Sequence, residues 1–364
     1  MEAAAQGGGG DGHERSDLHK AAGEVGDGGG GDAKRPREGD LNSIASILKY
    51  VEEEEEKGQE LGPFNPFAEG AFYREEWVSF YGQNGAKFED ATEQPPMRHT
   101  YGPVLPTHVE PMETMEVFYV KVTGIAGGLQ WPVAVYGDVA VRDSLDHMRI
   151  YLFRRSRDHC QTLTSPQDSL LELTGPSRAI ILLDHPIVEI DLKVKGTESP
   201  SEDEVLCCDL FGYNHISYEG KTSSARTKVV SSENSTIEVR FAHLTFSLEA
   251  TLHLRLVSGP GNFKARLTAT TASIGEEVVL LDSQDREMAV GEDGTVALQR
   301  RVVVVEDGGK LILCVEATMV GETESSNKVV RTLSFPPRSA LRSEKCFAVE
   351  SSILQMTVAW SLLP

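Results

Sequence analysis

Residues 188–194, VEIDLKV, point to the fold class because apolar and charged side chains alternate along them. The apolar residues share one face of an extended chain and the charged residues share the other: Val188, Ile190, Leu192 and Val194 against Glu189, Asp191 and Lys193. A period of two gives a strand one buried face and one solvent face, which is how strands of antiparallel sheets behave. This stretch therefore predicts an antiparallel sheet.

The same alternation recurs through the C-terminal two thirds of the chain. It is found at 236–241 (TIEVRF), 251–257 (TLHLRLV), 263–269 (FKARLTA) and 355–362 (QMTVAWSL). Turn sequences such as SGPGN, GEDG and EDGG separate the runs, and no helical pattern interrupts them after Met115. We expect residues 115–364 to form an all-β domain, a large antiparallel β-sandwich.

Two long stretches hint at an internal repeat. Residues 173–194 and 290–315 both read as turn, strand, short loop and strand. Each follows a hairpin-like pair, 116–122 with 131–139 in the first case and 251–257 with 263–269 in the second. Strand-rich sequences mimic one another easily, so one large sandwich and two related halves both stay open.

The N-terminal third has a different character. Residues 1–40 are rich in glycine and charge and predict a disordered acidic tail. Residues 41–93 predict a helical segment, with one helix starting at Leu41 after an Asp40 N-cap and a second, aromatic one at 71–82 (AFYREEWVSFYG). Residues 94–114 are Pro-rich and predict an extended connector.

Charge argues against two classes of partner. The chain carries 35 basic and 56 acidic residues, a net charge of −21, and has no basic stripe. Phosphate contacts need clustered Lys and Arg, so we expect neither nucleic acid nor a membrane surface as partner.

The composition also suggests a compartment. The first residues lack the apolar core of a signal peptide, and the longest apolar runs are far too short to span a bilayer. Five scattered cysteines read as reduced thiols. These features predict a cytoplasmic or nuclear protein. Residues 34–37, KRPR, are either a short nuclear-import signal or solvated charges of a tail.

The glycine-rich stretch GIAGG at 124–128 raises the question of a phosphate-binding loop. A P-loop needs Lys and Ser or Thr after its glycines, at the start of a helix. Here Leu129, Gln130, Trp131 and Pro132 follow and enter another strand. We therefore interpret GIAGG as a turn, and we predict no cofactor.

Metal ligands are sparse in the sequence. Cys207 and Cys208 are adjacent on a strand and so point to opposite faces, which is wrong for joint zinc ligation. The loop at 282–294 gathers carboxylates that could bind calcium, although without the spacing of an EF-hand: Asp282, Asp285, Glu292 and Asp293.

Catalytic signatures are equally weak. There is no GxSxG motif, and the Glu-Ala-x-x-Arg helix of plant ribosome-inactivating glycosidases is not matched at Glu249-Ala250, where His253 replaces the arginine. The best local candidate is RRSRDHCQ at 154–161, in which His159 precedes Cys160. A histidine and arginines near a thiol could lower its pKa and make a nucleophile. The alternative is a polar loop that ends a strand.

Several long phrases together resemble a known family. They are REEWVSFYGQNGAKFEDATEQPPMRHT at 74–100, the run from METMEVFYV to DHCQTL at 112–163, LTGPSRAIILLDHPIVEIDLKVKG at 173–196 and MTVAWSLLP at 356–364. The sequence is similar to a cereal-grass family that carries the domain of unknown function 6598. The resemblance implies a plant origin and a β-rich fold. It implies no activity, cofactor or site residue.

These observations favour a non-enzymatic binding or interaction module, whose partner is a protein or a small molecule. Loops of β-sandwiches commonly carry recognition, and those at 124–130, 154–164 and 282–294 are the first candidates. Two alternatives stay open. One is an enzyme with a site assembled from scattered residues, such as His159 and Cys160; the other is an adaptor that makes its contacts through the N-terminal segment.

Overall fold

The structure is a computed structural model that describes residues 66–364 except 103–104, 198, 216–221, 285 and 320–327. The predicted tail at 1–40, the KRPR sequence and the predicted helix that starts at Leu41 lie outside the described residues. The adaptor hypothesis, which depends on that N-terminal segment, therefore stays a prediction.

One α-helix, α2 (Pro66–Tyr81), opens the described chain and runs into a 3₁₀ turn at Gly82–Asn84. The helix predicted at 71–82 is thus confirmed. Tyr73 and Trp77 are buried, whereas Phe72 and Phe80 are exposed. Because the buried pair is four residues apart, it lies on one face of the helix.

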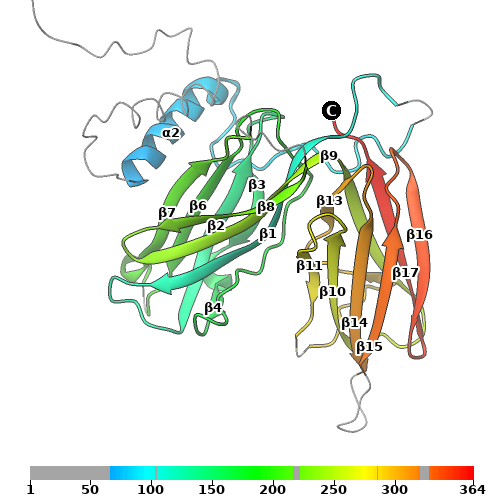
Figure 1. Ribbon diagram of the computed structural model, residues 1–364. Helices are drawn as coiled ribbons and strands as arrows, with labels where there is room; N and C mark the ends of the chain where they lie inside the picture. The colour runs from blue at the N-terminus through cyan, green and yellow to red at the C-terminus, as the bar shows by residue number, and fades with distance from the viewer. Residues whose placement is uncertain (1–65, 103–104, 198, 216–221, 285, 320–327) are drawn as a thin grey trace, which may run out of the picture. The chain divides into compact units, whose positions relative to one another are not determined.

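Strands make up most of the remaining described chain (Figure 1). Their bounds are β1 Met112–Ile125, β2 Val133–Arg142, β3 Ile150–Arg155, β4 Gln161–Leu163, β5 Ile180–Ile181, β6 Ile187–Val194, β7 Glu204–Gly212, β8 Ser224–Ser231, β9 Ser235–Ser258, β10 Phe263–Thr271, β11 Glu277–Asp282, β12 Thr295–Val296, β13 Val302–Glu306, β14 Leu311–Met319, β15 Val329–Phe335, β16 Arg342–Val349 and β17 Ser352–Ser361. Short 3₁₀ turns lie at Arg157–His159 and Pro200–Glu202. No helix among the described residues is long and apolar enough to cross a membrane.

The strands form three antiparallel sheets, which confirms the predicted fold class. The largest has the order β16-β17-β9-β1-β5, with β8, β12 and β13 also paired to β9. A four-stranded sheet has the order β11-β10-β14-β15. The third has the order β3-β2-β6-β7, with β4 paired to β2.

Strand β9 contributes to two separate hydrophobic cores. Its residues Ile237, Val239 and Phe241 belong to a core that also includes β2, β3, β6 and β7. Most of its even-numbered apolar residues from Ala242 to Leu254 belong to a second core, shared with β10, β11, β14 and β17. The first part of β9 thus packs in one core and the rest of the strand in the other.

The hairpin pairs that suggested an internal repeat do not form. β1 pairs with β9 and β5 rather than with β2. Residues 251–257, which belong to β9, pair with β17, β12 and β13 rather than with β10. Both expected turns instead carry the chain from one sheet to another. The duplication itself stays a prediction, without this support.

The GIAGG stretch is a turn, as expected. Its first two residues end β1, and Gly127 and Gly128 adopt positive φ values of 62° and 92°. A Cβ on Gly127 would lie 1.9 Å from the side-chain oxygen of Asn234, which lies in the turn between β8 and β9. The close approach of that turn therefore also favours glycine.

The stretch 188–194 forms β6, but its predicted solvent face is partly covered. Asp191 is exposed, whereas Glu189 is buried. Helix α2 lies beside β7 (Figure 1), and Tyr73, Trp77 and Phe88 pack with Ile187 of β6 on that face. Glu189 tolerates burial because Arg142 and Arg149 both donate to its carboxylate.

Candidate functional site

The loop at 154–164 and the start of the loop at 282–294 meet at one cavity of about 530 Å³, which we call the polar cleft. One side is lined by residues 160–162, Asp168 and residues 170–173 together with Arg155. The other side is lined by Val279, Asp282, Gln284, Arg286, Gln299 and Arg300, and Phe118 and Tyr119 of β1 also contribute. The third predicted loop, at 124–130, does not line it.

Strand pairing explains why residues 161–173 lie here. β4 pairs with β2 through Val133 and Leu163, which places Gln161 and Thr162 at the edge of that sheet. Residues 169–171 then run along β1, where the amide of Leu171 donates to the carbonyl of Val120 at 2.8 Å. Backbone hydrogen bonds to two sheets thus hold these lining residues in position.

Glu172 organises one side of the cleft. Its carboxylate accepts a hydrogen bond from Arg155 on one oxygen and from Gln284 Nε2, at 3.5 Å, on the other. Its amide donates to Gln161 Oε1 at 2.9 Å, and Gln161 Nε2 donates to the carbonyl of Leu170 at 2.8 Å. These bonds fix the orientation of polar side chains that line the cavity.

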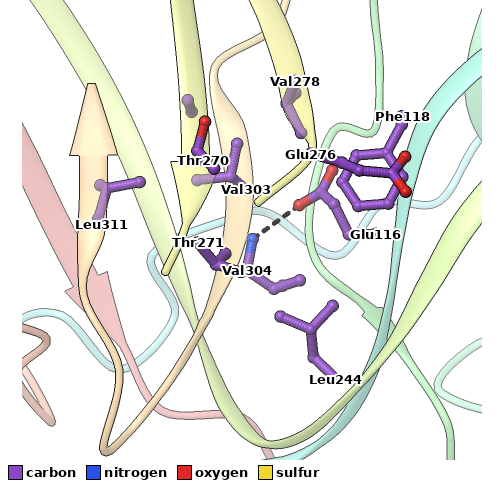
Figure 2. Close-up of a pocket in the computed structure, with 11 residues that line it drawn as sticks. Glu116, Phe118, Leu244, Thr270, Thr271, Glu276, Val278, Val303, Val304 and Leu311 are labelled. Carbon is purple, nitrogen blue, oxygen red and sulfur yellow. Dashed lines mark hydrogen bonds between the residues drawn. The ribbon is translucent and has the colours of Figure 1, made fainter. Parts of the chain in front are cut away.

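Arg300 anchors the other side. Its guanidinium, 2% exposed, donates to Glu116 Oε1 at 3.0 Å and to the carbonyl of Val117 at 2.7 Å. The amide of Val304 donates to the second Glu116 oxygen at 2.9 Å, the contact drawn in Figure 2. Burial raises the pKa of the Glu116 carboxyl to about 7.

A much smaller cavity, of about 10 Å³, lies beside Glu116. Its lining is largely apolar and includes Leu244, Val278, Val303 and Leu311, drawn with Glu116 in Figure 2. This volume is at the lower limit for one water molecule. The space is therefore a packing defect next to a buried ion pair rather than a ligand site.

The candidate thiol lines the polar cleft, as does Arg155 of the same motif. Cys160 is half-buried in the lining. The imidazole of His159 is exposed, and its Nδ1 lies 3.0 Å from Ser156 Oγ. Arg155 binds Glu172, and Arg157 binds Asp203 through two hydrogen bonds. The arginines of this motif are thus engaged by carboxylates, and the reactivity of Cys160 stays a prediction.

Of the candidate calcium ligands, Asp282 and Asp293 occupy separate turns. Asp282 Oδ1 accepts from the amide of Gln284, and its other oxygen lies 3.6 Å from Arg266. Asp293 caps its own turn by accepting from the amide and hydroxyl of Thr295, which lowers the pKa of that carboxyl. Glu292 is exposed, and Asp285 lies outside the described residues. Within the described part of the chain, no group of three His, Cys, Asp or Glu side chains could hold a metal ion.

Sequence reasoning missed a buried histidine cluster. The His243 ring is buried between the Tyr213 hydroxyl, 3.1 Å from Nδ1, and the Glu113 carboxylate, 3.2 Å from Nε2. The His215 ring packs edge-on against both His243 and His185. Burial lowers the pKa of His215 and of His243. The three histidines are far apart in sequence, so no local pattern could have grouped them.

Two comparisons with known proteins give little functional information. No curated protein matches the sequence. Among solved structures, human GIVD cytosolic phospholipase A2 matches with 12% identity, a TM-score of 0.23, and coverage of 71% of this chain and 33% of that chain. A structure of two C2 domains of extended-synaptotagmin 2 matches with 11% identity, a TM-score of 0.24, and coverage of 76% and 99%. These similarities are too distant to indicate a shared fold or activity.

A family profile gives the clearer result. The profile described as domain of unknown function (DUF6598) matches residues 114–358, which cover most of the strands from β1 to β17. This match agrees with the resemblance carried by the sequence phrases. The chain therefore belongs to the DUF6598 family.

Proposed function

We propose that this protein is a non-enzymatic binding module that takes a polar ligand in the polar cleft. The observation that carries the proposal is the cavity of about 530 Å³ itself, because two loops suspected from the sequence line it. Its volume falls in the range of roughly 300–1,000 Å³ that is typical of small-molecule sites.

The lining favours a ligand held by hydrogen bonds. Glutamine, arginine, threonine and carboxylate side chains contribute most of it, and several are held in place by bonds to one another, as at Glu172. Side chains that are already oriented lose little freedom when a ligand binds, which lowers the entropic cost of association.

A ligand screen on the full chain tests this proposal. Melting temperature would be followed with amino acids, nucleotides, inositol phosphates and oligosaccharides, and hits would be measured by calorimetry. Thr162 is exposed and lines the cleft, so Thr162→Trp should obstruct the cavity without disturbing the core and should abolish binding.

Matched arginine variants provide the control. Arg286 lines the cleft and Arg338 does not, and both are exposed. Arg286→Ala should change the affinity of a cleft ligand, whereas Arg338→Ala should leave it at the wild-type value. The proposal fails if no compound binds, or if Thr162→Trp binds every hit as well as the wild type.

One observation favours an enzyme as the second candidate, namely the position of Cys160 in the lining of the same cleft. The rate of thiol alkylation at neutral pH distinguishes an enzyme from a binding module, with the exposed Cys346 as an internal reference. Labelling of Cys160 at least tenfold faster than Cys346 would support a nucleophilic thiol. Labelling at the same rate or slower would remove the enzyme hypothesis.

A further inference from the structure

We infer that the ligand of the polar cleft is a neutral, hydroxyl-rich molecule, a short oligosaccharide. This inference rests on the proposed function and specifies the chemical class of its ligand.

The formal charge of the lining is balanced. Three arginines (Arg155, Arg286 and Arg300) stand against three carboxylates (Asp168, Glu172 and Asp282), so the sum is zero. A site for a phosphate or another strong anion would carry an excess of arginine or lysine, and a cation site an excess of carboxylates. Neither excess is present in the lining.

The charges are also largely neutralised within the protein. Arg155 is paired with Glu172, Arg300 with Glu116, and Asp282 lies 3.6 Å from Arg266. An ionic ligand that binds at Arg155, Arg300 or Asp282 would have to displace one of these partners and leave it without its counter-charge. A neutral ligand can instead add hydrogen bonds at the edges of the existing pairs.

The neutral polar side chains match the chemistry of hydroxyl groups. Gln161, Gln284, Gln299 and Thr162 all line the cleft, and each such side chain contains both donor and acceptor capacity. A sugar hydroxyl likewise donates and accepts, so neighbouring hydroxyls of one ring can bond to amides and carboxylates alternately. Planar side chains held in fixed orientations suit this pattern.

The cleft also offers apolar surface for the faces of a sugar ring. Leu170 is 50% exposed, and the half-buried Tyr119 of β1 also lines the cleft. The Tyr119 hydroxyl donates to Glu238 at 2.6 Å, and this bond raises the pKa of Tyr119 to about 12. The phenol therefore stays neutral, and its ring is held in place to pack against C–H groups.

Calorimetric titration of the full chain tests the inference with defined probes. The neutral arm contains cellotriose, xylotriose and maltotriose; the anionic arm contains ATP and inositol hexakisphosphate; the peptide arm contains neutral tripeptides. We expect at least one trisaccharide to bind, with an affinity that changes less than about twofold between 50 and 500 mM salt, because screening acts only on charged partners. Thr162→Trp should abolish this binding, and Arg338→Ala should not affect it.

The outcomes separate the inference from the proposed function. Binding of an anionic or peptide probe that is lost in Thr162→Trp, with no saccharide bound, would overturn the inference and keep the cleft as a binding site. Saccharide binding that survives in Thr162→Trp would place the sugar elsewhere and overturn the inference. Failure of all three arms would overturn both.

Discussion

At the scale of single residues, charged side chains removed from water are the main surprise. Arg178 donates to both oxygens of Asp143, at 2.6 and 2.8 Å, and the side chains of both residues are almost completely buried. Asp143 also accepts from the amide of Ile181 at 2.9 Å. The pair therefore ties the end of β2 to β5. Loss of one partner would leave a buried charge uncompensated.

Asp143→Ala is expected to destabilise the protein by ~3–5 kcal/mol, since it removes the two-bond carboxylate partner of the buried Arg178 guanidinium and leaves the 3.3 Å pair with Asp146. Urea unfolding measures this change. Glu277→Ala is the control, because its pair with Arg266 is exposed and should be worth less than about 1 kcal/mol. Equal losses in the two variants would contradict the structural role of the buried pair.

The histidine cluster predicts a loss of stability in acid. Burial lowers the pKa of His215 and His243 below the value of about 6.5 expected in the unfolded chain. The unfolded state therefore binds more protons than the folded state as the pH falls below 6.5. Above pH 6.5 these neutral histidines make their full contribution to the free energy of unfolding. That contribution decreases as the pH falls towards their pKa values in the folded state.

The charged groups around the cluster do not reverse the lowering of the two histidine pKa values. Glu113 and Asp184 favour protonation, whereas Arg226 and the neighbouring histidines oppose it, and desolvation is the largest effect for both rings. We expect the contribution of His215 and His243 to the free energy of unfolding to decrease between pH 7 and pH 5, whereas Glu116, whose pKa is raised to about 7, acts in the opposite direction.

His215→Phe keeps an aromatic ring that cannot be protonated. The free energy of unfolding of this variant, relative to that of the wild type, should therefore increase as the pH falls from 7 to 5. Urea unfolding at several pH values measures the difference. His159→Phe, at an exposed ring outside the cluster, should follow the wild-type curve. Parallel curves for His215→Phe and the wild type would refute the assignment.

At the scale of elements, α2 is attached to the sheet by one aromatic contact region. Trp77 is 2% exposed, and its indole Nε1 donates to the carbonyl of His147 at 2.9 Å. Its ring packs edge-on against Phe88, and the Arg142 guanidinium lies 4.8 Å from the ring centroid. These contacts explain why an aromatic-rich helix covers the outer face of β6.

Trp77→Ala should cost ~3–5 kcal/mol, because it removes a large buried side chain and leaves a cavity. Hydrogen exchange should also increase in α2 and at Glu189, whose cover would be weakened. Phe72→Ala on the exposed face of the same helix, where Phe72 is 55% exposed, should be nearly neutral in both measurements. A similar loss of stability for the two variants would show that the helix does not dock through Trp77.

At the scale of the whole described chain, the shared sheet couples the two cores. β9 supplies Ile237 to one core and Leu252 to the other, and β1 supplies Val117 and Phe118 in the same way. Unfolding of one core would remove hydrogen-bonded partners from strands that also form the other. The two cores are therefore expected to unfold together.

Calorimetry of Ile237→Ala and Leu252→Ala checks this coupling. Each truncation should lower the stability by ~2–5 kcal/mol and should shift one common transition to lower temperature. Two resolved transitions, of which each variant moves only one, would contradict the cooperative unit.

Local periodicity was sufficient to predict several of the strands and α2. Alternation at 188–194, 263–269 and 355–362 marks real strands, and the aromatic spacing of Tyr73 and Trp77 marks the helix. The sequence also indicated that GIAGG is a turn, and two of the three loops that it suggested for recognition line the polar cleft. These features depend on near neighbours in the chain, which is why a single sequence contains them.

Pairing, burial of charge and the meeting of loops were decided only by the tertiary structure. The sequence placed Glu189 in solvent, but α2 covers it and two arginines bind it; likewise, β1 pairs with β9 across more than a hundred residues. No local sequence pattern connects Glu116 with Arg300, and none connects the three histidines. Alternation specifies which face of a strand is apolar, but it does not specify which strand lies beside it or what packs on top. Those choices depend on contacts between distant residues, and they are what bring the polar cleft together.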